Sequence, residues 1–199
     1  MKWALILITL GGLTLAACGD SLEGDGDIVT ESRTVAQFDA VDADNGVRVI
    51  LTVDSTSAGD VVLAVTTDSN LQEFLTTEVT DSTLRTSPDR TGGVTSSSGF
   101  NVSGTVAGIG DVVSNNGARV EVIGAVGAIT LSADGGGRIE GESLEATTVT
   151  VDAADGAQIR ICATGAVTGD VTNGAELTVL CGGDVSGVRT SDGGAVSAQ

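Results

Sequence analysis

The sequence predicts an all-β protein: a parallel β-helix (β-solenoid) with coils of about 19 residues, preceded by a β-rich N-terminal half. Three observations lead to this expectation. Glycines recur at a nearly constant interval through the second half of the chain, and an alternating strand follows each of them. Aromatic residues are scarce, with three Phe, one Trp and no Tyr in 199 residues.

The glycine repeat decides the predicted architecture. Successive turn glycines are separated by 18, 19, 20, 18 and 19 residues, and they are Gly99, Gly117, Gly136, Gly156, Gly174 and Gly193. After Gly117, Gly136, Gly156 and Gly174, the first, third and fifth positions are small or aliphatic, and the positions between them are polar or charged. A unit this short, with no helical half, buries its apolar positions most simply by stacking into parallel coils.

Stacking places equivalent residues of successive coils one above another, at about 4.8 Å. A narrow interior of this kind accommodates Val, Ile, Leu and Ala, which explains the scarcity of rings. On the outward side, Arg119 and Arg138 would stack with Glu121 and Glu140 beside them, and Arg160 would extend the glutamate column. We interpret these positions as a solvated ladder of paired charges.

The N-terminal half also favours strands. Residues 47–53 and 61–66 alternate with period two and are joined by the turn-rich segment 54–60. Asn70 to Leu75 predicts one short helical turn, and residues 78–86 predict two short strands around Asp81-Ser82. Residues 87–98, which contain the only Pro of the chain, predict a surface loop. Residues 28–199 are expected to form a single domain.

The first 18 residues have the pattern of a bacterial lipoprotein signal. A short positive start is followed by an apolar run from Ala4 to Leu15 and by Leu15-Ala16-Ala17-Cys18, which is similar to a lipobox. We expect residues 1–17 to be removed and Cys18 to be lipidated, anchoring the protein to a membrane, most simply the outer membrane. The alternative is an ordinary secretory signal in which Cys18 is incidental.

Residues 18–27 are small, polar and acidic, which predicts a flexible tether between the lipid and the domain. Gly24 to Asp27 and Asp42 to Gly46 are rich in aspartate but lack the spacing of a calcium-binding loop, so we interpret them as tether and turn. Asn and Asp also recur at the turns of the repeat, where weak calcium binding is the alternative to a purely conformational role. These residues are Asn115, Asn116, Asp134, Asp155, Asn173 and Asp192.

Composition excludes most catalytic chemistry. The chain has no His and no Tyr, and Met1, Lys2 and Trp3 are its only residues of those types. Histidine general bases, lysine Schiff bases and imidazole metal sites are therefore excluded from the mature chain, and we expect no enzyme activity and no cofactor. The net charge is −18. An acidic chain with few aromatic residues is a poor partner for nucleic acid.

Two further cysteines lie one repeat apart. Cys162 and Cys181 are separated by 19 residues, so stacked coils would bring them near one another in an oxidising compartment. They stand six and seven residues after their respective glycines, so strict alternation would point them to opposite faces unless a corner intervenes. We predict a disulfide between them, with two free thiols as the alternative. Two thiols without histidine are a poor ligand set, so we expect no metal site.

The order of these motifs resembles the head GIN domain family. The resemblance rests on Val29 to Val41 (VTESRTVAQFDAV), on Asn70-Leu71 with Thr77-Glu78-Val79, and on the repeated Gly-Ala-x-Val/Ile units. It spans roughly residues 28–199. Members are commonly described as putative autotransporter-type adhesins of unknown function, often on lipoproteins. The resemblance implies a right-handed β-helix and brings no catalytic residues. Asn-Gly and Asp-Gly stand here where relatives often have Ser-Gly.

These observations predict a lipid-anchored, non-catalytic module of the cell envelope that is adhesin-like or structural. Its expected partners are the membrane, through Cys18, and an envelope polysaccharide or surface protein. Self-association through the open end of the solenoid is a further expectation. The alternative is a polysaccharide-binding protein or one like the β-helix polysaccharide lyases.

Overall fold

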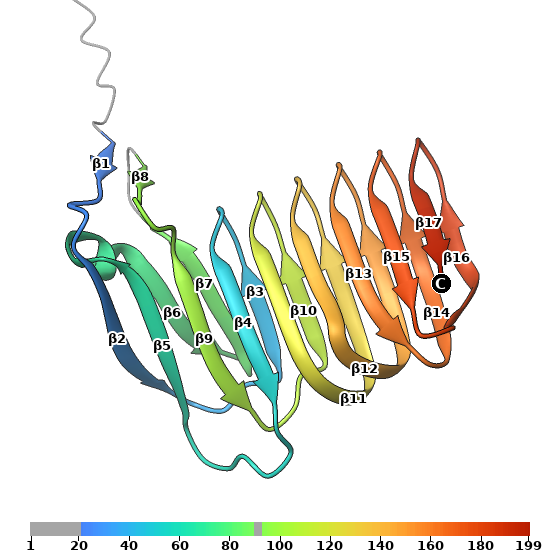
Figure 1. Ribbon diagram of the computed structural model, residues 1–199, viewed down its shortest axis with the longest axis horizontal. Helices are drawn as coiled ribbons and strands as arrows, with labels where there is room; N and C mark the ends of the chain where they lie inside the picture. Colours follow the sequence, from blue (N-terminus) through green and yellow to red (C-terminus); the bar gives the residue numbers. More distant parts are fainter. Residues whose placement is uncertain (1–20, 90–92) are drawn as a thin grey trace, which may run out of the picture.

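The computed structural model describes residues 21–89 and 93–199. The predicted signal peptide and Cys18 lie outside the described residues. Figure 1 shows strands that lie side by side and follow one another along the long axis of the molecule. The strands are β1 (Leu22–Glu23), β2 (Ile28–Val35), β3 (Ala40–Ala43), β4 (Arg48–Val53), β5 (Val61–Asp68), β6 (Leu75–Thr80), β7 (Thr83–Pro88), β8 (Val94–Thr95), β9 (Asn101–Val106), β10 (Asp111–Ser114), β11 (Arg119–Ala133), β12 (Arg138–Ala153), β13 (Gln158–Ala163), β14 (Ala166–Val171), β15 (Glu176–Leu180), β16 (Asp184–Thr190) and β17 (Ala195–Ala198).

The predicted all-β class is confirmed. One 3-10 helix, η1 (Ser69–Phe74), interrupts the strands of the described residues, at the place where the sequence predicted a helical turn. The main sheet is mixed, however. Most pairs are parallel, among them β3 with β10 and β15 with β17, whereas β2 with β5, β5 with β9, and β6 with β7 are antiparallel. Parallel pairing alone therefore does not describe the domain, because the chain reverses direction at its N-terminal end.

The main sheet folds back on itself into two layers of strands, with the core between them (Figure 1). We call these layers the first face and the second face. The first face runs in the order β2, β5, β9, β4, the first parts of β11 and β12, then β13, β15 and β17. The second face runs in the order β6, β7, β3, β10, the last parts of β11 and β12, then β14 and β16. The long strands β11 and β12 pass from the first face to the second, so each face receives one segment per repeat.

Tight corners join the second face to the first. At each corner the amide of the fourth turn residue donates to the carbonyl of the first, as Ala118 does to Asn115 at 2.9 Å. The two central residues have positive φ, 48° at Asn116 and 75° at Gly117. Asn and Gly tolerate this left-handed conformation at little cost, which explains why the repeat carries Asn-Gly and Asp-Gly. Gly136, Gly156, Gly174 and Gly193 have the same conformation.

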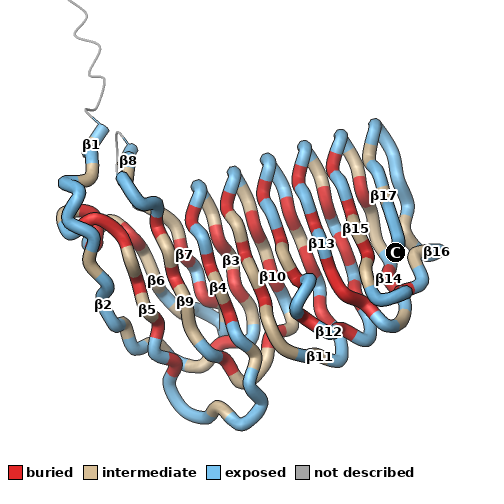
Figure 2. Tube along the Cα trace, viewed as in Figure 1, coloured by how far each residue is buried: buried red, intermediate tan, exposed pale blue. Residues whose placement is uncertain are grey.

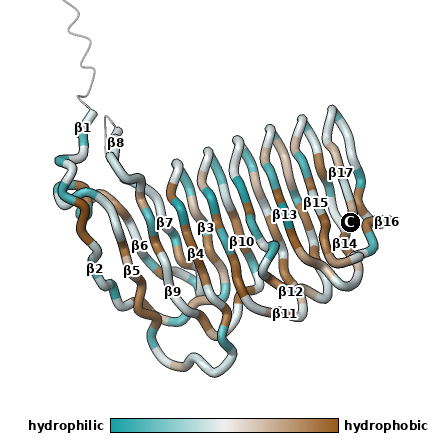
Figure 3. Tube along the Cα trace, viewed as in Figure 1, coloured by the Kyte–Doolittle hydropathy of each residue, from teal (hydrophilic) through white to brown (hydrophobic). Residues whose placement is uncertain are grey.

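The register reproduces the glycine spacing. Val120 pairs with Ile139, Ile139 with Ile159, Ile159 with Leu177, and Leu177 with Val196. The first four of these side chains are at most 1% exposed, so they form one continuous apolar column inside the stack. Figures 2 and 3 show the same alternation as buried, hydrophobic bands along the strands in the middle of the stack.

Two features of the N-terminal half differ from the simple repeat. Gly99 lies in a loop before β9 and forms no corner of the stack, although it also has positive φ. Gly46, which the spacing did not include, forms a corner between β3 and β4 equivalent to that at Gly117. The coil of β3 and β4 lies between β7 with β9 on one side and β10 with β11 on the other. The spatial order therefore departs from the chain order.

Residues 21–27 are attached to the domain, which corrects the expectation of a flexible tether for this segment. β1 pairs in parallel with β8, Leu22 opposite Val94, and the amide of Gly26 donates to Asp68. The predicted loop 87–98 is corrected in the same way. Its described residues include the end of β7 and all of β8, because β1 supplies β8 with a partner that local sequence does not reveal.

A cluster of polar and apolar groups covers the N-terminal end of the core. Leu71 in η1 is fully buried there. The guanidinium of Arg33 in β2 donates to the carbonyls of Leu75 at 2.5 Å and Gln72 at 2.6 Å, which links the outer strand of one face to the outer strand of the other. The amide of Gln72 donates to the carbonyls of Val29 and Val65. We call Arg33 and Gln72 the polar clasp.

Candidate binding surface

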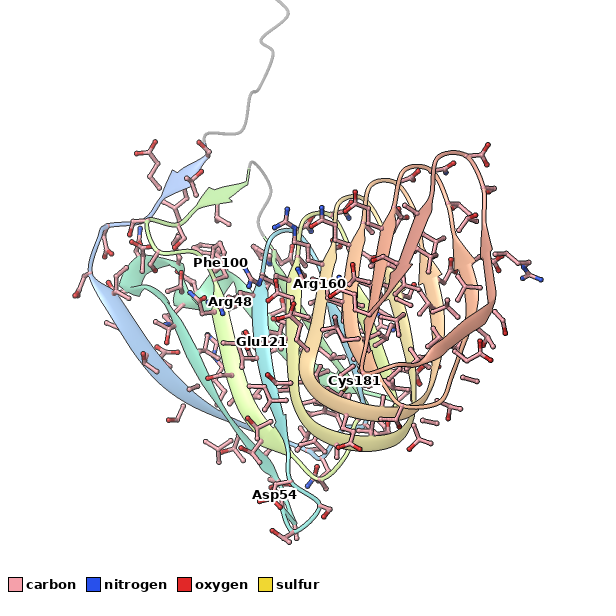
Figure 4. All side chains as sticks on the ribbon, turned by 45° about the vertical axis from the view of Figure 1, so that its right-hand side comes forward. Arg48, Asp54, Phe100, Glu121, Arg160 and Cys181 are labelled. Atoms are coloured by element: carbon pink, nitrogen blue, oxygen red, sulfur yellow. A yellow bond between two sulfur atoms is a disulfide. The ribbon has the colours of Figure 1, made fainter. Side chains whose placement is uncertain are left out.

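The disulfide joins two successive coils. Cys162 and Cys181 are bonded, with their Cα atoms 5.1 Å apart. Cys162 pairs in register with Leu180, so Cys181 lies one residue beyond the aligned position. The positive φ of Cys181, 70°, turns the chain there. This is the corner that the unequal spacing required, and it brings the exposed Cys181 (labelled in Figure 4) to the buried Cys162.

The outward positions of the first face carry the predicted charge ladder. Arg48, Arg119 and Arg138 are register partners, and Glu121 and Glu140 stand two residues further along. Each ion pair runs diagonally to the next coil: Arg48 contacts Glu121 at 3.1 Å (Figure 4), and Arg119 contacts Glu140. Exposed pairs of this kind contribute at most about 1 kcal/mol each. Their main effect is to connect neighbouring coils through opposite charges.

Arg160 extends the ladder differently from the prediction. It is the register partner of Glu140, as expected, but its ion pair is with Glu142 on the same neighbouring strand, β12. On the second face, the guanidinium of Arg189 donates to both carboxylate oxygens of Asp170, at 2.8 and 2.7 Å. This bond lowers the pKa of Asp170 and raises that of Arg189. Both faces therefore use arginine to connect coils.

The Asn and Asp residues of the corners bind one another. The amide of Asn116 donates to a carboxylate oxygen of Asp44 at 2.8 Å, and the amide of Asn173 donates to Asp155 at 3.0 Å. Within residues 21–89 and 93–199, no three acidic or cysteine side chains gather closely enough to hold a metal ion. The bonds tie neighbouring corners together along the stack.

Asp68 forms a buried anionic centre that the sequence did not reveal. Its carboxylate accepts hydrogen bonds from the hydroxyl of Ser96 at 2.6 Å, from the hydroxyl and amide of Ser97 at 2.5 and 2.9 Å, and from the amide of Gly26 at 2.9 Å. Asp68 is fully buried. These donors, Ser96 foremost, hold the pKa of Asp68 well below its ordinary value although burial acts in the opposite direction. Three segments distant in sequence are thereby fixed at one point.

A groove of about 540 Å³ lies on the outer side of the first face, over β4, β5 and β9. Its floor is low because Ala64 and Ser103, directly opposite one another on neighbouring strands, are small. Ile50 of β4 stands beside Ser103, and Val62 of β5 borders the floor on the other side. Val62 is 58% exposed. Thus the groove combines exposed apolar side chains with hydroxyl groups.

The loop between β4 and β5 forms one side of this groove. Ser57 and Asp60 contribute to its wall. The loop is shaped by Asp54, whose carboxylate accepts hydrogen bonds from the amide and the hydroxyl of Thr56, at 2.9 and 2.7 Å. The bond from the Thr56 hydroxyl is the main cause of a lowered pKa at Asp54. The loop hangs below the sheet, with Asp54 labelled near its tip in Figure 4.

Sequence reasoning missed the groove, Asp68 and the polar clasp. A signal for the groove was present, since Val62 occupies an outward position of an alternating strand where a polar residue is expected. For Asp68 and Arg33 no local signal exists, because their partners are 28 to 44 residues away along the chain.

Comparison with known proteins supports the family resemblance. Residues 93–183 match the family described as "Putative auto-transporter adhesin, head GIN domain". This part of the chain is therefore similar to the head GIN domain. The matched residues of the head GIN domain run from β8 to the end of β15, so they include the disulfide and the β9 side of the groove.

Solved structures share the fold of this chain. One is a "putative adhesin" from Bacteroides fragilis NCTC 9343, 15% identical, with a TM-score of 0.51. Another is a "Putative lipid binding protein" from Parabacteroides distasonis ATCC 8503, 13% identical, with a TM-score of 0.50. Each alignment covers 90% of this chain and 100% of the other. At these identities the likeness concerns the fold alone. None of the curated proteins matches this sequence.

Within the described residues, no helix is both long and apolar enough to span a membrane.

Proposed function

We propose that this protein is a lipid-anchored binding module of the bacterial cell envelope, adhesin-like and without catalytic activity. The observation that carries the proposal is the match of residues 93–183 to a family described as adhesin domains. Cys18, in its lipobox-like context, would attach the chain to the outer membrane. Residues 110–199 would act as a short β-solenoid that presents its outer faces to a partner.

The chemistry of the side chains supports binding over catalysis. The chain contains no His or Tyr, and its one Lys lies at position 2. Arg48, Arg119 and Arg160 of the ladder each pair with a glutamate, so they are engaged in holding coils together. A polysaccharide lyase needs a base that can lose its proton, whereas an arginine paired with a carboxylate stays charged. This favours the binding module over the lyase alternative.

Anchoring is tested by expressing the full chain in a Gram-negative host and comparing it with the Cys18→Ser variant. We expect the wild-type protein to fractionate with the outer membrane and to carry the mass of a diacylglyceryl group and an amide-linked acyl chain. The variant should be found in the soluble periplasmic fraction. Equal fractionation of both proteins, with no added mass on the wild type, would refute the anchor.

Binding is tested with vesicles that display the full chain. We expect such vesicles to be retained on envelope material from the host and its neighbours, and bare vesicles to pass through. Incubation with acidic polysaccharides should release no unsaturated product. Release of that product would replace this proposal with the lyase alternative, and absence of retention on every envelope fraction would contradict an adhesin-like role.

A further inference from the structure

We propose that the groove over β4, β5 and β9 binds an extended segment of a partner polypeptide that carries apolar and cationic side chains. This inference rests on the proposed binding function and specifies its site and ligand class. Here "the groove" denotes the surface formed by Ile50, Thr52, Val62, Ala64, Ser103 and Thr105 together with the wall of Ser57 and Asp60.

The form of the groove suits a polypeptide in extended conformation. It is an open hollow that crosses three strands, of which β5 runs antiparallel to β9 and β4 runs parallel to it. Ala64 and Ser103 lower the floor at the centre. A small molecule would remain largely exposed in such a hollow, whereas small-molecule sites commonly cover most of the ligand surface. A chain segment several residues long can follow the hollow and leave it at both ends.

The apolar contribution comes from Val62 and Ile50. Val62 is 58% exposed, and among the described residues the only other exposed large hydrophobic side chain is Ile28, at 43%. Other outward positions around the groove carry the hydroxyls of Thr52, Ser103 and Thr105. A branched apolar side chain at the edge of a hollow is the type of feature that marks interaction sites on otherwise polar surfaces.

The electrostatic contribution selects a cation. Asp60 in the wall is the charged residue that lines the groove, and Asp54 belongs to the same loop. The cation on the adjoining outward position of β4 is Arg48, which is paired with Glu121 at 3.1 Å. With a net charge of −18 on the whole chain, a basic segment is attracted both at a distance and within the groove.

Other polymers fit this surface less well. Sugars bind in protein grooves by laying their apolar ring faces on aromatic side chains, and none lines this groove. Phe38 and Phe100 are buried at 3% and 6% exposure. Acidic polysaccharides and nucleic acids would be repelled by Asp60 and by the net charge.

The test uses the full chain, held in detergent, and three fluorescent probes of equal length. Two are end-blocked octapeptides, one alternating Val with Lys and one alternating Val with Glu; the third is a neutral glucan. Binding is measured by anisotropy, and its position by amide NMR shifts. We expect the Val-Lys peptide to bind and to shift amides of β4, β5 and β9. Binding of the Val-Glu peptide or the glucan with equal affinity would overturn the proposal, as would absence of binding by Val-Lys.

Four variants locate the site. Asp60→Lys and Val62→Lys should each weaken binding of the Val-Lys peptide about tenfold or more, as expected for central contacts of an interface. Asp111→Lys makes the same charge change on an exposed residue of the second face, and Ile28→Lys places the same charge at the other exposed apolar residue. Both should bind within about twofold of the wild type. Equal losses in all four would show diffuse attraction and would refute the groove.

Failure of the groove can be told apart from failure of the proposed function. If vesicles carrying Val62→Lys are retained on envelope material as well as the wild type, the binding module stands and the site assignment is wrong. If wild-type vesicles are not retained at all, the function itself fails, whatever the peptides do.

Discussion

The two halves of the molecule bury their cores by different means. From β10 onward every strand pair is parallel and each coil repeats the one before it. Before β10 the chain forms three antiparallel pairs, one 3-10 helix and a coil that lies out of sequence order. A periodic sequence can extend a stack, but a further identical coil always leaves the end of the core uncovered, because each coil needs a neighbour on both sides. The irregular half supplies that closure.

The burial of the core residues also differs along the stack. Val120 and Ile159, in the middle of the first-face column, are fully buried, whereas Val196 in the last described strand is only partly buried. At the other end Leu71 of η1 is fully buried. The stack should therefore be most stable in its middle and near its N-terminal closure, and least stable at β16 and β17.

The largest expected effect is a cavity in the middle of the column. Ile159→Ala should lower the free energy of unfolding by about 2 to 5 kcal/mol, because the side chain is fully buried between Ile139 and Leu177. Val196→Ala should cost about 1 kcal/mol. Urea unfolding followed by circular dichroism measures both. Equal costs would contradict a stability gradient along the stack.

The next effect concerns the disulfide. Replacing both Cys162 and Cys181 by Ser opens a 19-residue loop and should cost about 3 kcal/mol. Because coils contact only their neighbours, amide hydrogen exchange should accelerate in β16 and β17 and stay unchanged in β2 and β5. Uniform acceleration throughout the chain would mean that the domain unfolds as one unit and that the disulfide does not act locally.

Loss of the polar clasp, at the opposite end of the stack, should lower the free energy of unfolding by a smaller amount. Arg33→Met keeps much of the side-chain stem but leaves the carbonyls of Leu75 and Gln72 without this donor, at a cost of about 1 to 3 kcal/mol. Hydrogen exchange should now accelerate in β2 and β6 and not in β16. A matched control is Arg189→Met, because loss of its exposed ion pair with Asp170 should leave the free energy of unfolding nearly unchanged.

The smallest expected effect is on how the unfolding temperature depends on pH in acid. The folded-state pKa of Asp68 lies below the ordinary value of 3.8, so its contribution to stability is complete above that value and is lost as pH falls through the folded pKa. Below about pH 4 the wild-type unfolding temperature should fall more steeply than that of Asp68→Asn. Asp54→Asn, which alters a carboxyl of the exposed loop, should keep the steep acid dependence. Parallel curves for wild type and Asp68→Asn would show that Asp68 is not the titrating group.

Local pattern determined much of the fold in advance. Alternation predicted β4 and β5 within a few residues, since one buried face imposes a period of two. It also predicted a strand after each of Gly117, Gly136, Gly156 and Gly174, where β11, β12, β13 and β15 begin. The Asn-Gly and Asp-Gly pairs predicted the corners, because few other residues accept two consecutive positive φ angles. Composition alone removed the common catalytic side chains. The outward ladder of Arg119 and Glu140 was predictable from the same register.

Only the tertiary structure decided how the irregular half is arranged. The position of β3 and β4 between coils that follow them in sequence depends on pairings across 43 to 71 residues, and the alternating pattern of a strand is the same whichever neighbour it pairs with. For the same reason the burial of Asp68, the reach of Arg33 and the hollow between Ala64 and Ser103 were not predictable. Each arises where distant segments meet, and periodicity records only which side of a strand faces inward.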